Sequence, residues 1–110
     1  MDLRIDCRNV SMVPRWRTSV AHHLGKLINN AHDVTHARVT LEKDRHHKKG
    51  PVATVTMVLS VPGATITAHK TEKTFEQAIK AAAMAAGREL KAHRDKLKST
   101  EIRAPIELPD

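Results

Sequence analysis

Histidine and cysteine side chains can bind a metal or carry acid–base chemistry. The chain has eight histidines and one cysteine. His22 and His23 are adjacent, so on a helix they would point about 100° apart, which is a poor arrangement for two ligands of one ion. His46 and His47 lie in a run of basic residues that would repel a cation. There is no His-Glu-x-x-His motif and no glycine-rich phosphate loop. We therefore expect no metal site, no cofactor, no small-molecule substrate and no enzymatic activity.

Charge is the more informative feature. The chain has 19 lysines and arginines against 12 acidic residues, a net charge of +7. The excess lies in residues 1–98, which hold 18 basic and 9 acidic side chains, whereas residues 99–110 are slightly acidic. A compact domain with this balance usually binds a polyanion, most often nucleic acid. Charge alone leaves open a basic domain without such a partner.

The basic residues gather on two predicted helices. At about 100° per residue, the second helix has a basic stripe, with Arg88 at its margin. Its members are Lys80, Arg88, Lys91, Arg94 and Lys98. The first helix has an outward line formed by Arg15, His22 and Lys26, and a third basic cluster lies in the turn at 45–49. One stripe is usually a solvated helix face, but two on neighbouring helices, without matching acidic partners, predict a phosphate-binding surface.

Aromatic residues are almost absent, which narrows the mode of binding. The chain has one Trp, one Phe and no Tyr. Trp16 and Phe75 both lie on apolar helix faces, so we expect them to be core anchors. Proteins that read single strands by stacking need exposed aromatic side chains. The composition therefore favours contacts to the phosphates and sugars of structured RNA or a duplex.

Hydrophobic periodicity predicts the elements that position these side chains. Alternation indicates strands over 3–8, 37–42, 53–61 and 65–69, and helical spacing indicates helices over 14–29 and 75–97. The order β-α-β-β-β-α predicts an α+β fold, with a four-stranded mixed sheet and both helices packed on one face. Residues 1–98 form the domain and residues 99–110 a loose C-terminal tail. No apolar run approaches a membrane span and the N-terminus is no signal peptide, so we expect a cytoplasmic protein.

Two segments resemble the bacterial ribosome hibernation-promoting factor and ribosome-associated inhibitor family, also called the sigma-54 modulation protein family. The first is Pro14-Arg15-Trp16-Arg17 with the following Val20–Leu27, and the second combines Thr74–Ile79 with Arg88–Leu97. The resemblance covers residues 2–98, in the family's element order, and fits its short form, which lacks a separate dimerisation domain. It implies a fold similar to a double-stranded-RNA-binding domain.

The resemblance also implies a function. It implies a monomer that binds 16S rRNA in the mRNA and tRNA channel of the small ribosomal subunit, inhibiting translation and promoting ribosome hibernation under stress or in stationary phase. Its helix positions and the helical wheel together give these candidate rRNA-binding residues: Arg15, Arg17, His22, His23, Lys26, Lys80, Arg88, Lys91, His93, Arg94 and Lys98. Two other functions stay open, a general double-stranded-RNA-binding module and an interaction protein that modulates transcription.

Overall fold

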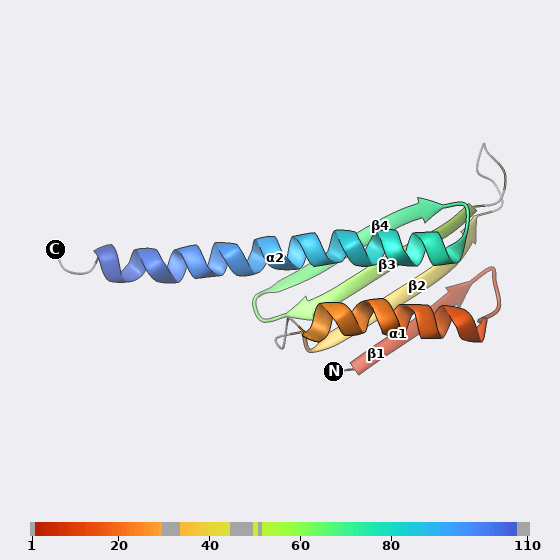
Figure 1. Cartoon of the computed structure of the whole chain (residues 1–110), viewed down its shortest axis with the longest axis horizontal. Coiled ribbons are helices and arrows are strands. Elements are labelled where there is room, and N and C mark those ends of the chain that lie inside the picture. Colours follow the sequence, from red (N-terminus) through yellow and green to blue (C-terminus); the bar gives the residue numbers. More distant parts are fainter. Residues whose placement is uncertain (1, 30–33, 45–49, 51, 108–110) are drawn as a thin grey trace.

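The protein consists of six elements in the predicted order β-α-β-β-β-α (Figure 1). The computed structural model describes the backbone of residues 2–29, 34–44, 50 and 52–107, and the side chains of all of these except residues 28–29 and 97–107. The elements are β1 (Asp2–Arg8), α1 (Pro14–Asn29), β2 (His36–Asp44), β3 (Val52–Val61), β4 (Ala64–Glu72) and α2 (Phe75–Glu107).

The strands form one mixed sheet in the order β1-β2-β3-β4. β1 runs parallel to β2, as a helical crossover between them requires, and β2, β3 and β4 form an antiparallel meander. At the β3–β4 turn Gly63 has a φ of 79°, a left-handed conformation that favours glycine. The register aligns apolar residues across the sheet, for example Leu41 with Val55 and Met57 with Ala68. One face of the sheet is therefore apolar along most of its length, with Lys43, Lys70 and Glu72 at one end.

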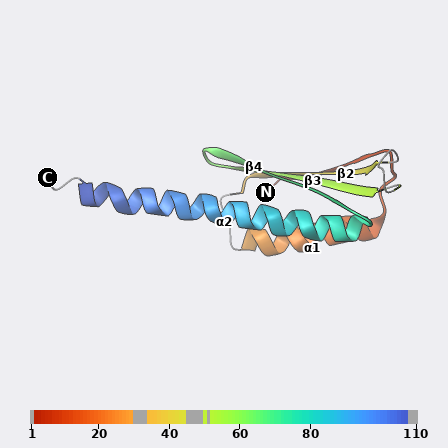
Figure 2. The same cartoon turned by 90° about the horizontal axis from the view of Figure 1, so that it is seen from above.

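Both helices cover this apolar face and leave the other face open, which confirms the predicted fold class (Figure 2). The core lies between the two layers and is built from Val20 and Leu24 of α1, Ile79 of α2 and the inward residues of the strands. Trp16 and Phe75 are each only 8% exposed, and their ring centroids lie 4.5 Å apart. Their predicted role as core anchors is confirmed.

The two helices lie side by side, with α2 packed on β3 and β4. Buried Ala82 and Ala86 let α2 approach the sheet, because small side chains keep the backbones close. At Gly87 a Cβ atom would lie only 2.7 Å from Cδ2 of Leu27, so a larger residue there would displace the end of that side chain. The N-terminus of α2 is capped by Thr74, whose Oγ1 accepts a hydrogen bond from the Gln77 N–H at 3.2 Å.

The C-terminal end of α2 differs from the prediction. We expected a helix ending near Leu97 and a loose tail from Ser99, but α2 continues to Glu107 and runs past the edge of the sheet (Figure 1). The helix continues because residues 88–104 contain neither glycine nor proline, the residues that usually stop one. The predicted end followed the apolar spacing of the sequence to Leu97, and that spacing alone does not mark where a helix ends. Within the described residues, no helix is both long and apolar enough to cross a membrane.

Candidate nucleic-acid interface

A groove lies between α1 and α2 on the exposed side of the helix pair. Its walls combine side chains from the first helix with side chains from the start of the second: Arg15, Thr18, Ser19, His22, His23, Glu76, Gln77 and Lys80. Four residues predicted to bind RNA, from two different helices, therefore line the same groove. Because α1 packs beside α2, the basic stripes of the two helices form one surface.

The groove contains an ion pair between the two helices. Nε of Arg15 lies 3.0 Å from Oε1 of Glu76, so the prediction that the stripes lack acidic partners is wrong at this point. The two residues belong to different helices, and a helical wheel drawn for one helix shows nothing of its neighbour. The two side chains are 71% and 55% exposed, so solvent screens the pair and its contribution to stability is small.

Two histidines lie beside this pair on α1. The rings of His22 and His23 are 5.3 Å apart at an angle of 72°. Burial, and then the nearby charges of His22, Lys26 and Lys80, lower the pKa of His23. His23 is therefore mostly uncharged at neutral pH, in a position where nearby cations oppose its protonation. An anion in the groove would reverse that effect.

The outward side of α2 extends the basic surface along the helix. Lys80, Arg88 and Lys91 are exposed there, and Lys26 is exposed on α1. Among the residues that the structure describes, no carboxylate lies within ion-pair distance of any of these four side chains. Met84, between Lys80 and Arg88, is 52% exposed and gives this face one apolar point. We call the groove together with these cations the helix face.

Three other predicted residues lie away from the groove. Arg17 is exposed on the β1 side of α1, where it opposes the rise that burial and Asp6 cause in the pKa of Cys7. His93 lies on the same line of α2 as Phe75, and its Nε2 is buried without a hydrogen-bond partner among the described residues. Arg94 is half-buried. The side chain of Lys98 and the cluster at 45–49 lie outside the described part of the chain.

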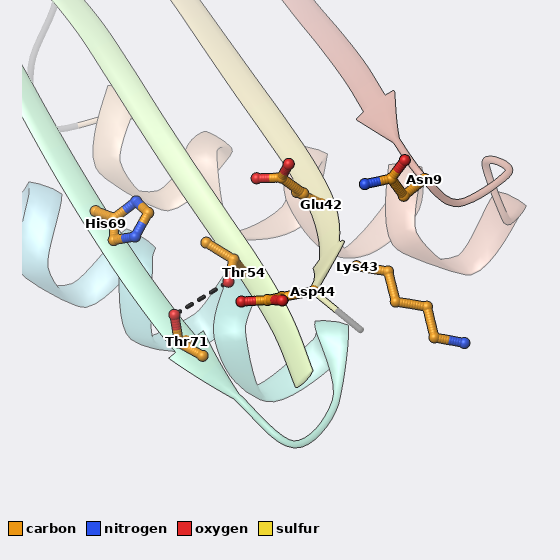
Figure 3. Close-up of a pocket in the computed structure, with 7 residues that line it drawn as sticks. All are labelled: Asn9, Glu42, Lys43, Asp44, Thr54, His69 and Thr71. Atoms are coloured by element: carbon orange, nitrogen blue, oxygen red, sulfur yellow. Dashed lines mark hydrogen bonds between the residues drawn. The ribbon is translucent and has the colours of Figure 1, made fainter. Parts of the chain in front are cut away.

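The open side of the sheet has a hollow of a different kind (Figure 3). It is lined by Asn9, Glu42, Lys43, Asp44, Thr54, His69 and Thr71. Thr54 alternates with the apolar residues of β3 and so lies on the open face, yet it is only 8% exposed, and its Oγ1 lies 3.1 Å from that of Thr71. Two carboxylates in the lining make this hollow unsuited to a phosphate. Within the described ranges, no group of three or more His, Cys, Asp or Glu side chains is placed to hold a metal ion.

Comparison with known proteins assigns the family. The sequence model of the sigma-54 modulation protein / S30EA ribosomal protein family matches residues 3–98. A ribosomal subunit interface protein from Coxiella burnetii has the same fold, with a TM-score of 0.77 at 13% identity over 86% of this chain and 99% of that one. The N-terminal domain of Protein Y from Thermus thermophilus is similar, with a TM-score of 0.71 at 18% identity over 84% and 99% of the two chains. No curated protein sequence matches significantly. Because the family match spans most of its length, the chain belongs to the sigma-54 modulation protein / S30EA ribosomal protein family.

Proposed function

We propose that this protein binds the small ribosomal subunit through its helix face and inhibits translation by occupying the channel for mRNA and tRNA. The observation that carries the proposal is the groove in which Arg15, His23 and Lys80 from two helices line one surface. Family membership and the ribosomal subunit interface protein with the same fold support a ribosomal partner.

The mechanism requires binding but no chemical step. Lys26, Lys80, Arg88 and Lys91 are exposed and unpaired within the described residues, so they can bind the phosphates of 16S rRNA without first breaking an internal ion pair. Contacts to phosphates fix orientation and register and carry little sequence information. A protein held in this way blocks the channel by its bulk, which leads to inactive, hibernating ribosomes under stress or in stationary phase. It acts in the cytoplasm and is a monomer when it is off the ribosome.

Co-sedimentation with purified small subunits over a range of salt concentrations tests the proposal. Each lysine or arginine on a phosphate releases counterions, so the logarithm of the affinity falls linearly with the logarithm of the salt concentration. An affinity that does not change with salt would contradict binding through phosphates. Duplex RNA at the same phosphate concentration as the subunits serves as competitor, and if it removes the protein from the subunit, the protein is a general duplex-binding module.

Inhibition is measured separately in a cell-free translation reaction with purified ribosomes. We expect protein synthesis to fall as the protein approaches the concentration of the small subunits, because one molecule occupies one channel. Added mRNA and initiator tRNA should restore synthesis, since they compete for the same space. If the protein binds subunits tightly yet leaves synthesis unchanged, its site lies outside the channel.

A further inference from the structure

A second cavity lies where the end of the sheet meets the first turns of both helices. It has a volume of about 410 Å³, which is within the range of small-molecule sites. Three cations from three different parts of the chain line it: Arg15 from α1, Lys43 from β2 and Lys73 from the segment between β4 and α2. Glu76 is the one carboxylate among the described lining residues, and it pairs with Arg15. The cavity therefore has a net positive rim.

The orientation of the helices adds to this positive potential. α1 and α2 run in the same direction, and both begin at this end of the molecule (Figure 1). The N–H groups of Gln77 and Trp16 already donate to Thr74 and Val13, but the helix dipole still places partial positive charge at each start. The rim of three cations and the two helix starts thus favour the same kind of ligand, an anion such as a phosphate group.

The inner wall of the cavity is apolar. Val10, Val52 and Ala53 line it, together with Trp16 and Phe75, which are largely buried. A phosphate ion alone would leave this wall in contact with water. A ligand that has a flat, partly apolar group next to a phosphate would cover the wall and reach the cations at the same time.

We propose that this cavity binds a nucleoside phosphate, with the phosphate at Lys43 and Lys73 and the base against the apolar wall. The nucleotide is either a free mononucleotide or an unstacked nucleotide of an RNA strand. Both present the same chemistry to the cavity. The site differs from the α1–α2 groove and shares only Arg15 and Glu76 with it, so nucleotide binding can be measured in the absence of ribosomes.

The single tryptophan of the chain makes the test direct, because Trp16 borders the cavity. Fluorescence of the full-length protein is measured during titration with uridine 5′-monophosphate, uridine, inorganic phosphate or short oligouridine at constant ionic strength. We expect a saturable change with the nucleotide below about 10 mM, the affinity range of a few charge-assisted contacts. Uridine and inorganic phosphate should bind at least about tenfold more weakly, because each lacks one half of the ligand.

Lysine variants locate the site. Lys73→Ala and Lys43→Ala should each weaken nucleotide binding by about five- to tenfold, since each removes a charge-assisted contact. Lys70→Ala is the matched control, because Lys70 is an exposed lysine of β4 that does not line the cavity. A circular dichroism melt of each variant checks that it is folded.

Each outcome is decisive. Saturation by the mononucleotide with this variant pattern supports the proposal for free nucleotides, and saturation by oligouridine alone, with the same pattern, supports it for RNA. The proposal is overturned if neither ligand saturates, or if inorganic phosphate binds as tightly as the nucleotide. An equal loss in Lys70→Ala also overturns it, because the effect would then be one of bulk charge.

Discussion

The open face of the sheet and the helix face both carry basic residues, but in different ways. On the open face, Nε atoms of Arg4 and Arg38 lie 3.9 and 3.1 Å from the carboxylate of Asp6, so this acid partly neutralises both. On the helix face, Lys80 and Lys91 have no carboxylate within ion-pair distance among the described residues. A cation without an internal partner can bind an external anion at little cost. The difference indicates which face is built for a polyanion.

Hydroxyl groups have internal partners on both faces, and in the groove Oγ1 of Thr18 donates to the Pro14 carbonyl oxygen at 3.2 Å. On the open face, Oγ1 of Thr56 lies 2.8 Å from Nδ1 of His69, and Thr54 and Thr71 pair across β3 and β4. These groups therefore satisfy one another within the sheet. Net charge alone does not separate the two faces. What separates them is that Arg4 and Arg38 share the carboxylate of Asp6, whereas Lys80 and Lys91 have no carboxylate partner among the described residues.

The largest expected effect comes from reversing charge on one face at a time. Arg88→Glu with Lys91→Glu should keep the fold, because both side chains are exposed, and should weaken small-subunit binding by several orders of magnitude. Each lost contact costs about 1–3 kcal/mol and repulsion from phosphate adds to it. Arg4→Glu with Arg8→Glu makes the same change in net charge on the open face. Equal loss in both double variants would show that only bulk charge matters.

A second experiment disrupts the layer that supports the helix face. Phe75→Ala should lower the free energy of unfolding by about 3–5 kcal/mol, because it removes a buried ring packed 4.5 Å from that of Trp16. Val58→Ala on the open face should cost under about 1 kcal/mol, since Val58 is only half-buried there. Urea denaturation measures both. A similar loss in the free energy of unfolding for both variants would contradict the position of the core in the structure.

A third experiment varies the pH. Both the stability of the protein and the affinity of its helix face for the small subunit should depend on pH through His23. Its pKa is lowered, first by burial and then by His22, Lys26 and Lys80. Just below a pH of about 6.5 the unfolded chain therefore binds more protons than the folded protein, so the free energy of unfolding falls as pH falls. Phosphates in the groove would raise the same pKa. Binding then takes up protons, and affinity rises as pH falls, by at most about tenfold per pH unit for each proton.

As the pH falls, the free energy of unfolding should fall while the affinity for the small subunit should rise. These opposite responses make the pH experiment specific. His23→Gln should flatten both the stability profile and part of the affinity profile between pH 8 and about 5.5, the range around the ordinary histidine pKa. His69→Gln removes a histidine from the open face and should leave the affinity profile unchanged. An affinity that falls on acidification would mean that no phosphate approaches His23.

Periodicity within single elements was enough to predict most of the fold. Alternation placed Val39, Val55 and Met57 on the covered side of the sheet, and the wheel placed Lys80 and Lys91 on the outside of α2, because each pattern depends only on local backbone geometry. The family resemblance led to the same fold.

Contacts between elements were not predictable in this way. The pair of Arg15 with Glu76, the burial of Thr54 and the cavity at Lys43 and Lys73 all depend on how far one element is shifted along another. No spacing within one helix or strand encodes that shift. The same limit explains the groove: the sequence predicted two stripes, and only packing shows which members of each stripe meet.

The smallest expected effect tests the comparison of the two faces most directly. Each variant removes the acidic partner of a cation, on one face at a time. Glu76→Gln releases Arg15 on the helix face, and Asp6→Asn releases Arg4 and Arg38 on the open face, with the same change in net charge. The Arg15–Glu76 pair is exposed, so its loss should change stability by less than about 1 kcal/mol. Small-subunit affinity, measured by co-sedimentation, should rise about two- to fivefold for Glu76→Gln, because one more cation is available to phosphate. Asp6→Asn should leave that affinity unchanged, and a gain there as large as that of Glu76→Gln would refute the assignment of binding to the helix face.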